Sequence, residues 1–276
     1  MPDRLDALLR HFAVSARLFH AGPLCGTHDF SDEEGFLHVV RSGTVDVHHQ
    51  GLKRIVIREP SLIFYPRPLR HRFSTDEKVG ADMTCATVEL GRAAQVKAGA
   101  GPLAQALPPV VVLTLAELPG MAALLDLLFE EALSPKCGRQ AVVNRLFEVL
   151  IIQLIRQLMN SNAVNTGLIA GLADPRLARA LVAMQEAPAD PWTLESLAEK
   201  AGMSRSAFAQ TFREIVGTTP GDHLAAWRLS LAQTLLRQGR PVKQVALDVG
   251  YGSPAALSRV FSARLGQSPR AWLKAA

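Results

Sequence analysis

The side chains best suited to chemistry in the first third of the chain are those of Cys25, His38, His71 and Cys85. Two thiolates and two imidazoles on different strands of one barrel can converge on a tetrahedral Zn²⁺ or another divalent metal. Two neighbouring thiols can instead form a regulatory disulfide. A buried cysteine also behaves as a small hydrophobic residue, so an inert core is the third interpretation that these residues allow.

Short β-favouring runs between about residues 13 and 92 indicate the strands that position these side chains. The runs are 36–40, 44–48, 54–57, 61–65 and 84–90, separated by turns rich in Gly and Pro. Many short strands at this spacing are typical of a barrel or jelly roll. The apolar neighbours of His38 predict that it is buried. A period of two places Met83, Cys85 and Thr87 on one face of their strand.

Helical periodicity begins after a loop that we expect over 93–109, and it predicts helices over 119–133 and 139–160. The second helix carries a wide apolar stripe: Val142, Leu146, Val149, Leu150, Leu154 and Leu158. This stripe can pack on the neighbouring helix and the barrel wall. Its width also fits the seam of a homodimer, the usual soluble oligomer. Residues 161–173 are expected to form a linker.

The last third of the chain contains the same pattern twice. In both copies a Ser precedes a Phe by eight residues, and the next Gly, Pro and Leu follow at intervals of five, three and four. The first copy begins at Ser204 and the second at Ser253. A short apolar helix, a Gly turn, a Ser N-cap and a second amphipathic helix make a helix-turn-helix. We predict these units at about 194–217 and 242–266, joined by a linking helix over 220–238.

Each residue type in the repeat has a physical reason. Gly202 and Gly250 lie in the turns, where a positive φ is cheap only for glycine. Ser204 and Ser253 can accept hydrogen bonds from the free backbone N–H groups that open the next helix. Pro254 falls at the first helical position, where its missing N–H costs nothing. Two such units in tandem indicate a DNA-binding domain, and a purely architectural pair of α-hairpins is the alternative.

The distribution of charge agrees with DNA binding. From Asp174 to the end there are 13 Lys and Arg against 8 Asp and Glu, and before Asp174 there are 17 of each. The whole formal charge of +5 therefore lies on the last third of the chain, as a phosphate-binding surface requires.

Length and composition set further bounds. The 276 residues exceed the usual size of one domain, so two are expected. Three cysteines do not suggest a disulfide framework. The first residues lack the apolar core of a signal peptide, and the apolar stretch 149–155 is too short to span a membrane. We expect a soluble, cytoplasmic protein. The sequence shows neither a Ser/His/Asp order nor a phosphate-binding glycine loop, so no enzyme activity is expected.

The stretch from Trp192 to Trp272 resembles the DNA-binding domain of the AraC/XylS transcription regulators. The resemblance is carried by Trp227-Arg228, by the run from Ala246 to Tyr251 and by the run from Phe261 to Pro269. The segment that leads into Trp192 resembles the subgroup whose amino-terminal half is a cupin-like barrel. The implied fold is α+β: a cupin-like β-barrel with a helical dimerisation element, then an all-α double helix-turn-helix domain.

The predicted DNA-binding residues include the two N-cap serines, Ser204 and Ser253, and the resemblance implies the others. It places base reading at Ser206, Ala209 and Gln210, and a Gln can bond adenine with two hydrogen bonds. Arg205 and Arg213 are better placed for phosphates. In the second unit the matching face comprises Pro254, Ala255, Ser258 and Arg259, of which Arg259 alone can make a strong base contact.

For the barrel, the resemblance implies a sensor. The similar subgroup carries a Cys in the first strand, a His before a Ser-Gly turn, a His after a Pro turn and a Cys in a late strand. Cys25, His38, His71 and Cys85 match these positions, and some members respond to oxidants through such cysteines. The chain lacks the His-x-His pair and the later Glu of ordinary cupins, which argues against a catalytic iron site.

The expected organisation is therefore a sensor and dimerisation domain over 1–160, with the barrel at 13–92, then the linker over 161–173 and a DNA-binding domain over 174–276. The expected function is sequence-specific regulation of transcription in response to a small molecule, a metal or a redox signal. The alternatives are a metal-dependent cupin enzyme with an added helical domain and an effector-independent DNA-binding protein. The expected partners are promoter DNA, a second copy of the chain and, for an activator, RNA polymerase.

Overall fold

The computed structural model describes residues 3–31, 33–49, 51–91, 101–161 and 164–275. The chain forms two compact units. The barrel unit comprises Val14–Leu90 and Leu107–Gln157, and the helical unit comprises Met1–Ala13, Gly91–Ala106 and Leu158–Ala276. A β-rich first half followed by a helical second half confirms the predicted α+β class.

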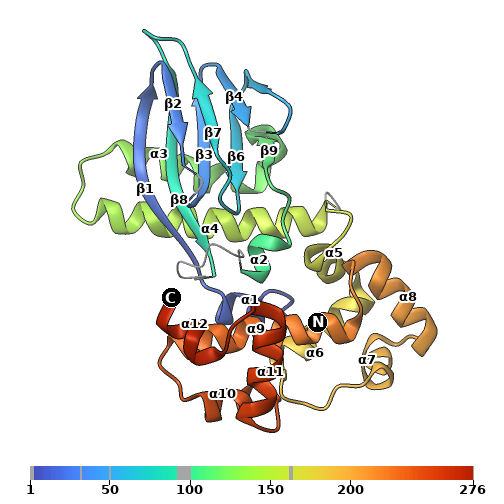
Figure 1. Cartoon of the computed structure of the whole chain (residues 1–276). Helices are drawn as coiled ribbons and strands as arrows, with labels where there is room; N and C mark the ends of the chain where they lie inside the picture. The colour runs from blue at the N-terminus through green and yellow to red at the C-terminus, as the bar shows by residue number, and fades with distance from the viewer. Residues whose placement is uncertain (1–2, 32, 50, 92–100, 162–163, 276) are drawn as a thin grey trace. The chain divides into compact units, whose positions relative to one another are not determined.

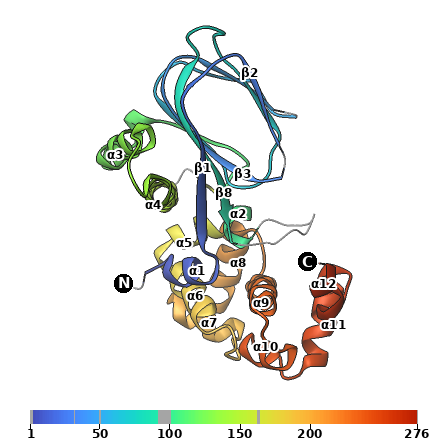
Figure 2. The same ribbon diagram turned by 90° about the vertical axis from the view of Figure 1, so that its left-hand side faces the viewer.

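The barrel unit is built from two antiparallel sheets (Figure 1). Within the described residues, the five-stranded sheet has the order β1-β8-β3-β6-β9 and the four-stranded sheet the order β2-β7-β4-β5. The strands are β1 (Val14–Leu24), β2 (Thr27–Phe30), β3 (Gly35–Ser42), β4 (Val45–His49), β5 (Ile55–Ile57), β6 (Ser61–Tyr65), β7 (His71–Ser74), β8 (Ala81–Leu90) and β9 (Val111–Thr114). Figure 2 looks into the barrel that the two sheets enclose.

The interior of the barrel is filled by side chains. Strand β4 alternates as expected, with Val45 and Val47 buried and Asp46 facing outward. Aromatic rings from both sheets meet in the core: Phe30 lies 5.6 Å from Phe36 and 4.9 Å from Phe73, between ring centroids. Such edge-to-face rings contribute beyond their buried area. This packing fixes the positions of the polar groups that lie among the rings.

Two helices of the barrel unit, α3 (Ala122–Leu133) and α4 (Arg139–Asn160), agree with the predicted ranges. They lie beside β1 in Figure 2. The pairing of β1 with β8 is irregular after Leu18. At this point, side chains of α4 form hydrogen bonds with the backbone of β1. Leu18 N–H donates to Asn144 at 2.9 Å, and the side chain of Gln140 donates to the Leu18 carbonyl at 3.1 Å.

Some elements differ from the prediction. The strands β1, β2, β7 and β9 have no predicted counterpart of their own. A short helix α2 (Pro102–Gln105) lies within the predicted loop 93–109, of which residues 93–100 fall outside the described residues. The helix α5 (Leu168–Ala173) lies in the predicted linker, and its residues from Leu168 to Leu172 are buried. Its apolar composition explains this, because it packs on α6 and α8.

The helical unit contains both predicted helix-turn-helix units. After α6 (Pro175–Glu186), the first is α7 (Leu194–Ala201) and α8 (Arg205–Val216), and the second is α10 (Val242–Asp248) and α11 (Pro254–Leu265). The linking helix α9 (Pro220–Arg237) joins them, and α12 (Pro269–Ala275) ends the unit. In the described ranges, no helix combines the length and apolar character needed to cross a membrane.

The first residues of the chain belong to the helical unit, whereas the predicted boundary placed them with the barrel. Helix α1 (Asp6–His11) buries Leu8, and the ring of Phe12 lies 5.1 Å from that of Trp227 on α9. Arg4 donates hydrogen bonds to the carbonyls of Leu172 and Ala173, at 2.8 and 3.1 Å. These carbonyls end α5, where a helix lacks internal donors.

Candidate functional sites

The first recognition helix, α8, begins as the sequence predicts. Helix α7 ends at Gly202, whose φ is +68°. Ser204 then caps α8, because its Oγ accepts a hydrogen bond from Ala207 N–H at 3.3 Å. Phe208 and Phe212 are fully buried, and their ring centroids lie 5.5 Å apart. Because these rings hold one face of α8 in the core, the opposite face is left for a ligand.

That opposite face carries the residues predicted to meet DNA. Arg205, Ser206, Gln210 and Arg213 are exposed, and Ala209 is half-buried. The side-chain amide of Gln210 donates to the Glu214 carboxylate at 2.9 Å. Nothing in the sequence indicated this bond, which Gln210 would have to give up in order to contact a base edge. The exposure of this face agrees with the predicted interface, and base reading by these residues stays a prediction.

The second recognition helix, α11, repeats the arrangement. The Oγ of Ser253 accepts from Ala256 N–H at 3.2 Å, and Pro254 occupies the first turn. Leu257 and Phe261 are fully buried, whereas Pro254, Ala255 and Arg259 are exposed and Ser258 is half-buried. Both serines therefore act as N-caps, and both recognition helices present an outer face.

Two of the four candidate chemical residues come together in the barrel. His38 on β3 and His71 on β7 are buried, and their Nε2 atoms lie 3.1 Å apart. The Nδ1 of His71 donates to the Leu69 carbonyl at 2.7 Å, so its Nε2 is the acceptor and His38 is the donor. The Nδ1 of His38 is then an acceptor with no hydrogen-bond partner among the described residues.

Burial keeps this pair uncharged. Desolvation lowers the pKa of His71 to about 4, and it lowers the pKa of His38 well below the usual range for histidine. Tyr65 stacks on His71 with ring centroids 3.9 Å apart, and its hydroxyl lies 2.8 Å from Nε2 of His49. Two neutral imidazoles in an aromatic core have lone pairs available for a cation or a proton.

The structure does not bring together all four residues of the possible metal site. Within the described part of the chain, no group of three or more His, Cys, Asp or Glu side chains is arranged to hold a metal ion. Cys85 is the neighbour of His38 across the β3–β8 pair, but it belongs to the apolar core, and burial raises the pKa of its thiol. A resident zinc takes three or four protein ligands. Because only the two histidines come together, the four residues do not fit a resident zinc.

Cys25 and Cys85, the alternative redox pair, lie apart in the structure. Cys25 is exposed and follows β1, and a Cβ placed on Gly80 would lie 2.7 Å from its Sγ. Cys85 lies five residues beyond Gly80 on β8, which is roughly 17 Å of strand. A disulfide needs Cα atoms within about 7 Å of each other. The resemblance matched Cys25 to a strand position, but the turn after β1 places its side chain at the end of the barrel.

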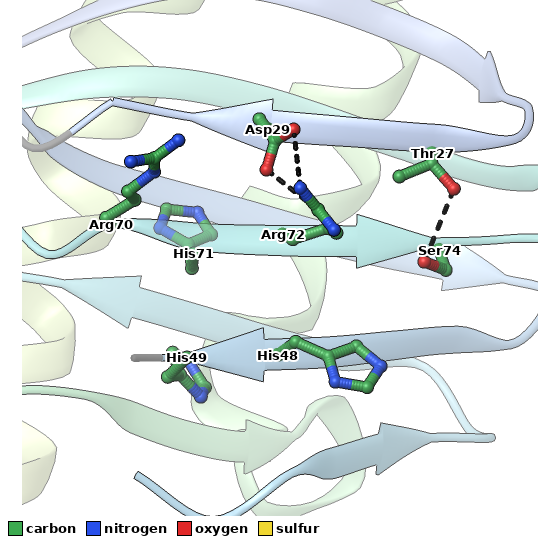
Figure 3. A pocket seen from close by; sticks show the side chains of 8 residues that line it. All are labelled: Thr27, Asp29, His48, His49, Arg70, His71, Arg72 and Ser74. Carbon is green, nitrogen blue, oxygen red and sulfur yellow. Dashed lines mark hydrogen bonds and ion pairs between the residues drawn. The ribbon is translucent and has the colours of Figure 1, made fainter. Parts of the chain in front are cut away.

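A surface cleft of about 500 Å³ lies on the four-stranded sheet beside the histidine pair (Figure 3). It is lined by Thr27, Asp29, His48, His49, Arg70, His71, Arg72 and Ser74. Asp29 accepts a hydrogen bond of 2.8 Å from Arg72, and Thr27 lies 3.5 Å from Ser74 between hydroxyl oxygens. His71 thus lines this cleft and also contacts His38. The contact of His49 with Tyr65 shows that His49 is partly a core residue.

Comparison with known proteins agrees with this architecture. Residues 3–160 match a family model described as cupin, and residues 197–275 match one described as a helix-turn-helix domain. An uncharacterized HTH-type transcriptional regulator of Haemophilus influenzae is 35% identical over 62% of this chain and 58% of its own length. The RCS-specific HTH-type transcriptional activator RclR of Escherichia coli is 28% identical over 84% of this chain and 81% of its own length.

A crystal structure of the DNA-binding domain of AdpA with a target DNA is 35% identical, covering 37% of this chain and 92% of that chain with a TM-score of 0.35. The chain spans only 43% to 58% of the length of the first four curated relatives that it matches. These four, like RclR, are named as transcription regulators and not as enzymes.

The fold and the family models together define a two-domain chain with an amino-terminal cupin barrel and a carboxy-terminal double helix-turn-helix. The chain belongs to the AraC family of HTH transcriptional regulators with an amino-terminal cupin domain. The resemblance that the sequence carried is confirmed.

Proposed function

We propose that this chain binds promoter DNA through both recognition helices and regulates transcription in response to a signal received by the barrel. The observation that carries the proposal is the pair of capped recognition helices, α8 and α11, each with an exposed outer face opposite a buried aromatic face. Arg205, Arg213 and Arg259 on these faces supply the positive charge that phosphates and guanine edges attract.

One chain is proposed to read two half-sites. Two recognition helices joined by one linking helix can enter successive major grooves on one side of DNA, about 34 Å apart. The test is a footprint of the full-length protein on a site selected from random duplexes. We expect two protected half-sites about one turn apart. An insertion of five base pairs between them turns the half-sites to opposite sides of the duplex and is expected to abolish binding. Unchanged affinity after that insertion would overturn the two-site reading.

The proposed oligomer is a homodimer formed through α4. The predicted apolar stripe divides into two parts: Leu150, Leu154 and Leu158 are buried within the chain, whereas Val142 and Val149 are 41% and 44% exposed. These valines are seven residues apart, so they share an outer face with the half-buried Leu146. Sedimentation of the wild-type chain and of Val142→Lys/Val149→Lys tests this. We expect a dimer and a monomer respectively, and a monomeric wild type would contradict the proposal.

The signal is proposed to act at His38 and His71 as an exchangeable metal ion. The Nδ1 of His38 has no hydrogen-bond partner among the described residues. The ring can therefore shift its proton from Nε2 to Nδ1 without breaking a hydrogen bond at Nδ1. Both Nε2 lone pairs then point into the 3.1 Å gap that separates them. Two donors are fewer than a resident zinc takes, which suits an ion that binds and leaves.

The test is titration of metal-free protein with Co²⁺, a coloured substitute for Zn²⁺, beside His71→Gln and His48→Gln. His48 is an exposed histidine on the same sheet and serves as the matched control. We expect one absorbing site per chain that His71→Gln loses and His48→Gln retains, together with a metal-dependent change in DNA affinity. Absorbance that does not depend on His71 would exclude the pair as the sensor.

A further inference from the structure

Arg228 connects the two helix-turn-helix units from the middle of the linking helix. Its Nε donates to the Pro188 carbonyl at 2.7 Å and its Nη2 to the Asp190 carbonyl at 2.9 Å. Both carbonyls lie in the loop between α6 and α7, immediately before the first unit. The same guanidinium lies 5.9 Å from the ring centroid of Tyr251, in the turn of the second unit. One side chain therefore contacts both units.

The turn of the second unit also contacts that loop directly. A Cβ placed on Gly250 would lie 2.8 Å from Ala189 Cα, 2.9 Å from the Pro188 carbonyl oxygen and 2.9 Å from Nη2 of Arg228. Two of these neighbours are backbone atoms, which cannot move aside as a flexible side chain does. Gly250 thus permits the loop, the turn and the guanidinium to meet at one point.

The second unit shares an apolar core with the later part of α9, and it also contacts the start of α9 through an ion pair at the surface. Arg264 on α11 donates to Asp222 at 3.0 Å, and these side chains are 47% and 57% exposed. Exposed ion pairs contribute little rigidity. By contrast, Arg228 is half-buried and directs a planar fork at two fixed carbonyls. The junction at Arg228 is more rigid than this ion pair.

We propose that Arg228 is a positioning residue for DNA recognition: it fixes the distance and angle between the two recognition helices and thereby sets the half-site spacing that the protein accepts. Arg228 does not need to touch DNA for this. The proposal rests on the function proposed above, in which one chain binds two half-sites. It names the residue that makes this binding selective for the spacing between the half-sites.

The experiment measures the affinity of full-length protein for a series of duplexes whose spacer is shortened or lengthened by one and two base pairs, and for a single half-site. The variants are Arg228→Met and Arg228→Lys, because neither keeps the forked donors. Arg237→Met is the matched control: the guanidinium of this half-buried arginine of α9 lies 4.5 Å from the ring centroid of Trp272 on α12.

We expect the wild type and Arg237→Met to lose at least tenfold in affinity for a two-base-pair change of spacer. For Arg228→Met and Arg228→Lys, we expect this ratio to fall below about threefold, with single half-site affinity within about twofold of the wild type. A variant at Arg228 that keeps the steep spacing dependence, with its affinity lowered by the same factor on every duplex, would overturn the proposal. A wild type that is indifferent to spacing would instead overturn the two-site reading itself.

Discussion

His38 and His71 share one hydrogen bond of 3.1 Å between their Nε2 atoms, inside an aromatic core that lowers the pKa of both rings. Each ring is neutral in the folded chain at neutral pH. In the unfolded chain each ring binds a proton near pH 6.5. The pair therefore makes the stability of the fold depend on pH. The direction of this dependence follows from the difference in proton binding between the folded and the unfolded chain.

Stability is expected to fall as the pH decreases from about 6.5 to about 4. In this window the unfolded chain takes up protons that folded His71, with a pKa of about 4, does not. His71 alone should remove about 2 kcal/mol of the free energy of unfolding between pH 8 and pH 5. Urea unfolding at several pH values measures this, with His71→Gln as the comparison. An unchanged pH slope in His71→Gln would mean that His71 titrates normally in the fold.

Thiol reactivity separates the three cysteines. Cys25 and Cys137 are exposed, whereas Cys85 is buried and its thiol has a raised pKa. We expect Ellman's reagent to modify two thiols rapidly in the folded chain and the third only after urea is added, because the thiolate is the reactive form. Cys25→Ser should leave one rapid thiol. Rapid modification of Cys85 in the folded chain would show that its strand opens readily.

The two glycines of the second turn provide a matched pair. Gly250 has a φ of +81° and backbone atoms within 3 Å of its missing Cβ, whereas Gly252 has nothing within 4 Å. Gly250→Ala is expected to lower the free energy of unfolding by roughly 3 kcal/mol, because strain and overpacking add. Gly252→Ala should change it by less than about 1 kcal/mol. Thermal or urea unfolding of both variants gives the comparison, and equal effects would rule out the close approach.

Gln210 and Arg213 are expected to act differently on DNA. Gln210→Ala should relax the base preference at one position by roughly 1–3 kcal/mol, because a Gln amide reads an adenine edge. Arg213→Ala should weaken binding to all sequences and reduce the salt dependence by about one ion. Binding to the selected site and to single-base variants, at several salt concentrations, tests both. Equal losses for Gln210→Ala on selected and random DNA would contradict base reading.

The helical half could be predicted closely because its signals are local. Ser204 and Ser253 begin the two recognition helices as expected, and the glycine turns precede them. Contacts between units are not local: the partners of Arg228 lie 38 and 40 residues away in the chain. The sequence showed Trp227-Arg228 as part of a resemblance but gave no sign of which carbonyls the guanidinium meets.

The barrel was predicted as a class of fold, and its site was predicted only in part. The burial of His38 follows from its apolar neighbours, and the structure confirms it. The meeting of His38 with His71 depends on how β3 and β7 face each other across two sheets, which no pattern within either strand records. The place of Cys25 depends on where β1 ends, and strand ends are poorly marked in the sequence.

The helical unit begins with the first residues of the chain and closes with the last. During synthesis, α1 leaves the ribosome long before α9, so the apolar surface of Phe12 stays uncovered until Trp227 has been made. The barrel, whose segments end at Gln157, has all its residues available first. A carboxy-terminal fragment that starts at Gly167 would keep α5 but lack α1, exposing Trp227 to water. Such a fragment is expected to aggregate at concentrations at which the whole chain stays dispersed. Fusing residues 1–13 to the start of the fragment should restore its solubility.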